Sequence, residues 1–220
     1  MPLQATDRAK RPRKERKENA ERRRAQLIDA AMRSIQKKGL RGTTLATVAK
    51  EAKLSQGVAI FYFETKENLL AAVFERQYEI YTQNWQVARK AAKGPAARLA
   101  AMLYSDFDPD VCSNAARALW FAFWGETNAS PAFKDIADRF DVLRDTALRD
   151  EVAALLRQSD GNHDRCDELA ALVESLTDGL WLQMHLGRVV TDGQRAKRIV
   201  QSVLQSYFPH FVADFALPDA

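Results

Sequence analysis

Apolar residues recur every three or four positions along most of the chain, which is the period of an amphipathic α-helix. The segment after Thr65 shows this period well, with Leu70, Phe74 and Tyr81 on one face. Strand-like alternation is absent, and the breaks carry helix caps such as Gly39. We therefore predict an all-α protein. The expected helices cover about residues 20–38, 45–52, 56–61, 65–93, 95–106, 111–126, 131–158, 163–186 and 192–208.

Two of these helices are short, and a tight turn at Lys53 and Leu54 joins them. A helix precedes this pair and a long helix follows it. This is the layout of a helix-turn-helix, in which the second short helix enters the DNA major groove with its N-terminal residues first. We predict a disordered basic arm over residues 1–19, a helix-turn-helix DNA-binding domain over 20–66, and a helical ligand-binding and dimerisation domain over 67–220.

The charge of the chain divides in the same way. The net charge of +4 is the sum of +10 over residues 1–66, with 17 Lys/Arg and 7 Asp/Glu, and −6 over residues 67–220, with 16 and 22. A solvated tail would explain the bias over residues 1–20. It does not explain Lys37, Lys50 and Lys53, which continue the bias into an ordered-looking region. A basic N-terminal third on an acidic body therefore favours a polyanionic partner such as DNA.

Several other classes of protein lack support in the sequence. No apolar run approaches the roughly 18 residues of a membrane span, and the charged N-terminus has no apolar segment after it. Cys112 and Cys166 do not make a disulfide framework, so we expect a cytoplasmic protein. No catalytic motif is present, and His163 and Cys166 lack further metal ligands nearby. We expect neither an enzyme nor a bound metal or cofactor.

The helix-turn-helix carries specific candidates for DNA contact. Gln56 has an amide that can pair with adenine, and Gly57 permits a close approach of the backbone. Lys66 places a cation at a helix N-terminus, where phosphate binds well. Ile60 can touch a thymine methyl group, although Ile60 and Phe61 can also be core residues. The predicted DNA-binding residues are Thr44, Ser55, Gln56, Gly57, Val58, Ile60, Phe61, Tyr62 and Lys66.

The run TTLATVAKEAKLSQGVAIFYFETKENLL resembles the DNA-binding domain of the tetracycline-repressor (TetR) family, and the resemblance covers about residues 20–75. The matching features are Thr44, Val48-Ala49, Ser55-x-Gly57, Tyr62-Phe63 and Thr65-Lys66-Glu67-x-Leu69. The chain departs from the family at Lys53, where glycine is usual, and at Ile60-Phe61. The resemblance implies an all-helical, dimeric repressor that binds double-stranded operator DNA and senses a small molecule.

Two runs in the second region are unusually aromatic, SDFDPDVCSNAARALWFAFWGET and LTDGLWLQMHLG. Trp120, Phe123 and Trp124 share one helix face, and Asp178 and Trp181 share another. If the two faces meet, they form an aromatic box with a carboxylate at its edge. Quaternary ammonium ligands have no N–H to donate, so such a box suits them. A plain aromatic core is the alternative. The predicted ligand-binding residues are Tyr104, Phe107, Trp120, Phe123, Trp124, Asp178 and Trp181.

The same two runs resemble the regulators of betaine synthesis within the TetR family. This resemblance implies a repressor of choline uptake and oxidation genes that responds to choline or a related quaternary ammonium compound. Other ligands, such as carnitine or the drugs sensed by efflux regulators, stay open. A helical carrier or enzyme and a protein-interaction adaptor are the alternatives from other classes. The carboxylates at Asp135, Asp138, Asp141 and Asp145 are typical of a solvated helix face.

The last two predicted helices carry more apolar surface than a terminal hairpin needs. These residues are Leu169, Leu172, Val173, Leu176, Ile199, Val203, Leu204 and Phe208. We expect a homodimer through these two helices, with part of the surface used for packing within the chain.

Overall fold

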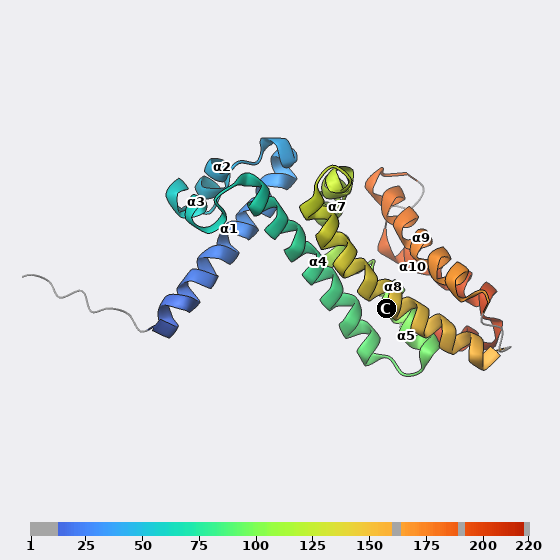
Figure 1. Cartoon of the computed structure of the whole chain (residues 1–220). Coiled ribbons are helices and arrows are strands. Elements are labelled where there is room, and N and C mark those ends of the chain that lie inside the picture. Colours follow the sequence, from blue (N-terminus) through green and yellow to red (C-terminus); the bar gives the residue numbers. More distant parts are fainter. Residues whose placement is uncertain (1–12, 160–163, 189–191, 218–220) are drawn as a thin grey trace, which may run out of the picture. The chain divides into compact units, whose positions relative to one another are not determined.

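The structure is a computed structural model that describes residues 13–159, 164–188 and 192–217. These residues form helices and no strand (Figure 1), so the predicted all-α class is confirmed. The chain divides into two compact units, residues 1–73 and 74–220. Helix α4 (Lys66–Ala91) begins in the first unit and continues into the second. None of the described helices is long and apolar enough to cross a membrane.

The first unit holds α1 (Arg13–Gly42), α2 (Leu45–Glu51) and α3 (Gln56–Phe63) before α4 begins. Helix α1 starts earlier than predicted, so residues 13–19 of the expected arm are helical. Residues 1–12 lie outside the described residues. Gly39 breaks the regular geometry of α1 with φ 69° and ψ 176°, close to the predicted end of this helix.

The turn between α2 and α3 explains one departure from the TetR pattern. Lys53 has a φ of 55°, a left-handed conformation that glycine adopts without steric cost. The family's usual glycine fits this geometry, whereas Lys53 adopts it with some strain. Before this turn, Thr44 caps α2 by accepting a hydrogen bond from the Thr47 amide (3.1 Å), and the Thr44 amide donates to the Thr47 hydroxyl (2.9 Å).

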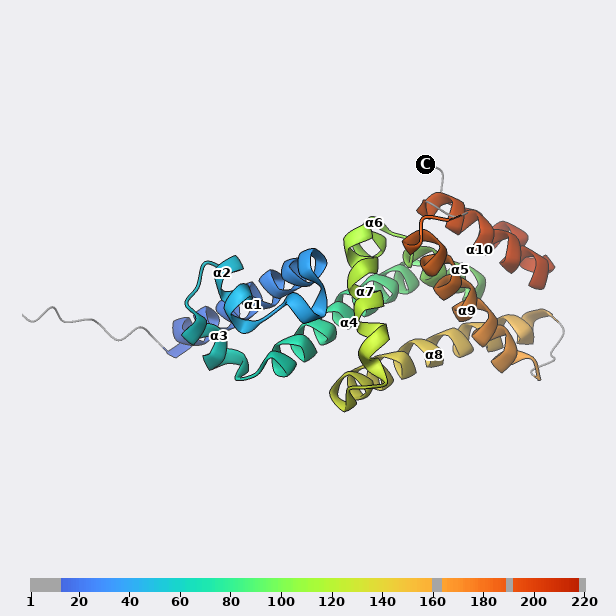
Figure 2. The ribbon, with the colours of Figure 1, turned by 90° about the horizontal axis from the view of Figure 1, so that it is seen from above.

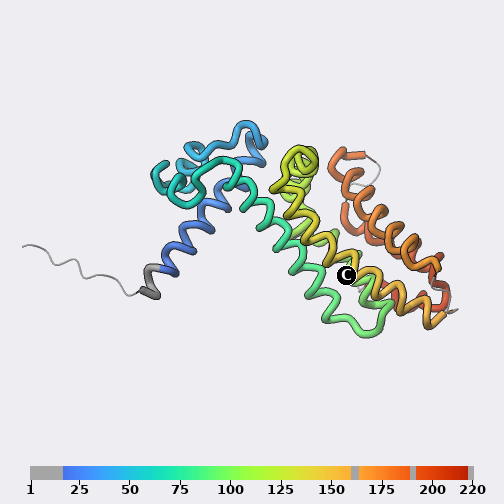
Figure 3. Tube along the Cα trace, viewed as in Figure 1, coloured from blue at the N-terminus to red at the C-terminus, as the bar shows by residue number. Residues whose placement is uncertain are grey.

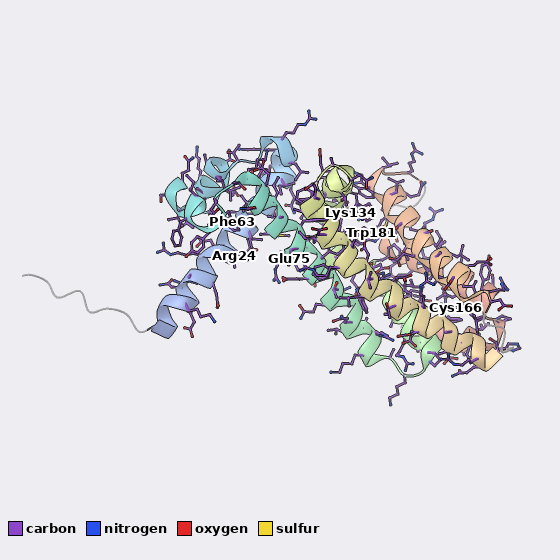
Figure 4. All side chains as sticks on the ribbon, in the orientation of Figure 1. Arg24, Phe63, Glu75, Lys134, Cys166 and Trp181 are labelled. Carbon is purple, nitrogen blue, oxygen red and sulfur yellow. The ribbon has the colours of Figure 1, made fainter. Side chains whose placement is uncertain are left out.

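A small core holds the first unit together. The predicted inner face of α1, represented by Leu27, Ala31 and Ile35, is buried. Across the unit, Phe63 is also buried, and the guanidinium of Arg24 lies 5.5 Å from its ring centre (Figure 4). The packing of α2 against both α1 and α3 therefore fixes the face that α3 turns to solvent.

The second unit contains the rest of α4 and all of the later helices. They are α5 (Pro95–Ser105), α6 (Pro109–Cys112), α7 (Asn114–Thr127), α8 (Pro131–Ser159), α9 (Cys166–His185), α10 (Gly193–Tyr207) and a 3-10 segment, η1 (Pro209–Phe215). Figures 2 and 3 show α8 lying alongside α9, with which it is in contact. Helix α5 packs on α8, α10 and η1, and α7 packs on α8 and α9. Helices α4, α7, α8 and α9 together supply most of a cavity wall.

Packing within the chain uses about half of the apolar surface predicted for a dimer interface. Leu169, Val173, Leu204 and Phe208 are buried in the second unit. Leu172, Leu176, Ile199 and Val203 are only half-buried. Leu182 of α9, Leu186 at its end and Tyr207 of α10 are exposed. The apolar surface that remains available for a dimer is thus smaller than predicted, and part of it lies on residues that were not predicted.

Candidate functional site

The first turn of α3 is open to solvent. Ser55 caps the helix in an extended conformation, and its side chain makes no capping hydrogen bond. Gln56 and Gly57 are exposed and Val58 is half-buried, whereas Ala59 is fully buried. The helix is anchored through its inner residues, and its N-terminal turn is free to meet a partner, as a reader helix requires.

Two apolar residues on α3 are also exposed. Ile60 is 45% exposed and Phe61 is 78% exposed, so the alternative that Phe61 belongs to the core is wrong. The Phe61 ring touches only the half-buried ring of Tyr62 among the described aromatic contacts, with 5.2 Å between ring centres. Exposed apolar side chains next to the open turn are typical of a binding surface.

Two predicted DNA-binding residues already make contacts within the fold. The exposed Thr44 uses its hydroxyl and amide to cap α2. The ammonium of Lys66 donates a hydrogen bond to the Arg41 carbonyl oxygen at 3.2 Å, and this residue is half-buried. A phosphate contact by Lys66 therefore has to share the ammonium with the end of α1.

The second unit encloses a cavity of about 430 Å³. Four predicted ligand-binding residues line it: Trp120 and Trp124 from α7, and Asp178 and Trp181 from α9. The indole centres are 6.1 Å apart for Trp120–Trp124, 6.2 Å for Trp120–Trp181 and 6.5 Å for Trp124–Trp181. The structure thus brings together the two helix faces that the sequence analysis paired.

The other three predicted residues do not line this cavity. Phe123 is fully buried and stacks on Phe74 with 4.6 Å between ring centres, because its part of α7 faces the core. The hydroxyl of Tyr104 donates to the Phe215 carbonyl oxygen at 2.7 Å and so ties α5 to η1. Phe107 is buried beside α10. The structure places these three side chains outside the cavity lining, because the period of one helix does not show which neighbour each side chain meets.

Several lining residues were not predicted as ligand contacts. Tyr78 and Tyr81 come from α4, and each has its ring centre within 6 Å of Trp120. Phe140 of α8 stacks on Tyr78 at 5.1 Å. Asp141 of α8 also lines the cavity, and it is exposed, as predicted for a solvated helix face. The aromatic period of α4 and the adjacent Phe140-Asp141 pair are signals that would have indicated these residues.

The floor of the cavity contains a buried ion pair. Arg144 of α8 donates to the Asp106 carboxylate at 2.6 Å and to both oxygens of Glu174 at 3.0 Å. Its guanidinium lies 5.1 Å from the ring centre of Tyr81. Desolvation raises the pKa of Asp106 to about 7, and the positive charge of Arg144 limits that increase. The indole N–H of Trp181 donates to the Asp106 carbonyl oxygen at 2.9 Å, which fixes one wall to this floor.

The described lining residues include five carboxylates, Asp106, Asp141, Asp145, Glu174 and Asp178, and one guanidinium, Arg144. The indole N–H groups of Trp85 and Trp120 and the Nη1 of Arg144 are buried and have no hydrogen-bond partner among the described residues. Aromatic faces and an excess of negative charge favour a small cation. The unpaired donors favour a ligand that also carries an acceptor oxygen.

Each of the two units matches a known protein family. Residues 27–73 match the family of bacterial regulatory proteins called tetR, and residues 95–209 match the BetI-type transcriptional repressor C-terminal domain. The HTH-type transcriptional regulator BetI of Burkholderia mallei is 33% identical over 184 residues, which are 83% of this chain and 91% of that protein.

Two solved structures show the same fold. A putative transcriptional regulator from Pseudomonas aeruginosa has a TM-score of 0.78 and 21% identity, over 89% of this chain and 95% of that one. A putative transcriptional regulator from Saccharomonospora viridis, solved in complex with choline, has a TM-score of 0.76 and 17% identity, over 84% and 96%.

Proposed function

The chain belongs to the TetR family and is a BetI-like transcriptional regulator rather than an enzyme, and we propose that choline or a related quaternary ammonium compound controls its affinity for operator DNA. The observation that carries this proposal is the cavity in which four tryptophans and two tyrosines meet an excess of carboxylates. The choline bound to the regulator from Saccharomonospora viridis supports it. The regulated genes would then serve choline uptake and oxidation, in the cytoplasm where operator DNA is found.

The ring geometry indicates where the cation sits. The three indole centres form a triangle with sides of 6.1, 6.2 and 6.5 Å, so the rings touch one another and leave no room between them. At an ordinary cation–π separation of about 5 Å from each centre, a cation lies about 3.5 Å above this triangle. The cation therefore rests on one side of the three tryptophans, facing the rest of the cavity. Carnitine and other methylated cations fit the same chemistry.

Trp124→Ala is expected to weaken choline binding about tenfold, because the variant removes one aromatic face from the cation. The effect is measured by calorimetric titration with choline. Phe211→Ala is the control, since Phe211 is a half-buried aromatic residue of η1 that lies outside the cavity lining and belongs to none of the described aromatic contacts. The neutral isostere 3,3-dimethylbutanol should bind wild type at least tenfold more weakly than choline. Equal binding of the two compounds would refute the proposed cation site.

The exposed face of α3 supports operator binding through the first unit. A two-fold dimer would place two copies of α3 in successive major grooves, about 34–36 Å apart, so a near-palindromic operator is expected. We propose that the exposed Leu182, Leu186 and Tyr207, with their half-buried neighbours, form the dimer surface. Residues 1–12 are expected to add affinity that is independent of sequence, because they carry Arg8, Lys10 and Arg11.

Gln56→Ala is expected to reduce discrimination at one operator base pair, because it removes an amide that can pair with adenine. Phe61→Ala should weaken operator binding about tenfold through loss of an apolar contact with DNA. Both side chains are exposed, so neither change should alter the melting temperature much.

The measurement is fluorescence anisotropy with an operator selected from random duplexes. Val87→Ala, another exposed apolar position, is the control. Unchanged affinity and base preference in both variants would exclude α3 as the reader helix.

A further inference from the structure

The charges around the cavity form two groups. On the floor, the guanidinium of Arg144 is bound by Asp106 and Glu174, so its charge is already balanced. Asp145 is similarly paired with Arg149 at 2.8 Å. These groups have partners before any ligand arrives.

The mouth of the cavity differs. Asp141 of α8 and Asp178 of α9 line it, remain exposed, and form no ion pair with a basic side chain in the part of the chain that the structure describes. The hydroxyl of Tyr78 bonds to Asp141, and the ring of Tyr78 stacks on Phe140. One helical turn after Asp178 lies Trp181. Two carboxylates beside aromatic faces are therefore the part of the cavity whose charge is not balanced.

The titratable groups around this mouth come from α4, from the end of α5, and from α8 and α9. From α4 come Tyr78 and Tyr81, and desolvation raises the pKa of both hydroxyls above the ordinary value, so they stay neutral. From the end of α5 comes Asp106, and from α7 come indoles alone among the described lining residues. The remaining charged groups are Asp138, Asp141, Arg144 and Asp145 of α8, and Glu174 and Asp178 of α9.

We propose that the cation of the ligand is held between the carboxylates of Asp141 and Asp178 and that it enters in exchange for a proton held by this pair. This proposal rests on the proposed function. One positive charge arrives with the ligand and one leaves as a proton to solvent. The cavity wall desolvates both carboxylates and neighbouring negative charges add to the effect, so each holds a proton more readily than a carboxylate in water does. A bound cation stabilises the ionised carboxylates, so the proton is released when the ligand binds.

The acid–base properties of the two residues agree with this exchange. Partial desolvation by the cavity wall raises the pKa of Asp178 to about 6, and Glu174 adds to the increase. Desolvation likewise raises the pKa of Asp141 to about 6, against the hydrogen bond from Tyr78. A bound cation stabilises the ionised carboxylate and lowers these pKa values. Affinity for the cation is then full above about pH 6 and is lost as the pH falls through that value.

The number of protons released on binding is measured by calorimetric titration of the full-length protein with choline in two buffers of different ionisation enthalpy. At pH 6 we expect release of about half a proton for each of the two carboxyls, and at pH 8 almost none. The dissociation constant should be about a hundredfold weaker at pH 5 than at pH 8 if both carboxyls return to a pKa near 4. The neutral 3,3-dimethylbutanol should release no proton.

Asp141→Asn and Asp178→Asn should each weaken choline binding and reduce the proton release, and the double variant should abolish both the release and the pH dependence. Asp135→Asn is the matched control, because Asp135 is an exposed residue of α8 outside the cavity lining. Circular dichroism melting confirms that the variants fold.

Proton release that persists in the double variant would assign the proton to Asp106 and overturn the exchange. Choline binding with no release at pH 6 would also overturn it while leaving the proposed function intact, whereas no choline binding at any pH would remove the function itself.

Discussion

Arg144→Met is expected to lower the free energy of unfolding by about 3–5 kcal/mol, because it leaves the buried carboxylate of Asp106 without its cationic partner. Glu174 is less affected, since its side chain is 38% exposed and can return to water. Denaturant unfolding followed by tryptophan fluorescence measures the change. All four tryptophans lie in the second unit, so the signal reports on that unit.

The loss should grow with pH. Desolvation already raises the pKa of Asp106 to about 7 in wild type, and without Arg144 it rises further. A carboxyl whose pKa is higher in the folded state than in the unfolded state stabilises the fold at low pH, and this contribution is lost as the pH rises. The gap between variant and wild type should therefore widen from pH 5 to pH 8.

Two further variants separate charge burial from general damage. Arg149→Met removes an exposed arginine from the same helix and should change stability little. Arg144→Met combined with Asp106→Leu should recover much of the loss, since an apolar pair can replace a buried ion pair. A loss in Arg144→Met that does not vary with pH, or a double variant as unstable as the single one, would show that the ion pair is not the cause.

The sequence predicted the fold well because a helix is a local structure. Apolar spacing and caps such as Thr44 are set within a few residues, and the elements they indicated are present. The least accurate prediction was the start of α1, where the polar residues 13–19 gave no apolar period to follow. The positive φ of Lys53 could not be predicted either, because a lysine at this position gives no signal for a backbone geometry that favours glycine.

The cavity was only partly predictable because it is built from several helices. Spacing placed Trp120 and Trp124 on one face, and the structure puts both on the wall. The same spacing included Phe123, which lies on the edge of that face and turns to α4 instead. The pairing of Arg144 with Asp106 joins residues far apart in the chain, and no local pattern contains it.

Phe74 shows how the core of the second unit supports the cavity wall. It is fully buried, and its ring centre lies 4.6 Å from Phe123, 4.9 Å from Tyr78, 5.5 Å from Phe133 and 6.0 Å from Trp120. Tyr78 and Trp120 both line the cavity. A change at Phe74 should therefore affect stability and ligand binding together, although Phe74 itself does not line the cavity.

Phe74→Ala is expected to lower the free energy of unfolding by about 3–5 kcal/mol, because it leaves a cavity among four aromatic rings. It should also weaken choline binding, since Tyr78 and Trp120 lose the surface that holds them in place. Phe74→Leu keeps much of the volume and should cost less than about 1.5 kcal/mol. Val87→Ala, at an exposed position of the same helix outside the cavity lining, should leave both quantities nearly unchanged. Denaturant unfolding and choline titration of the three variants measure both effects. If Phe74→Ala loses stability but binds choline as tightly as Val87→Ala does, the aromatic core does not position the cavity wall.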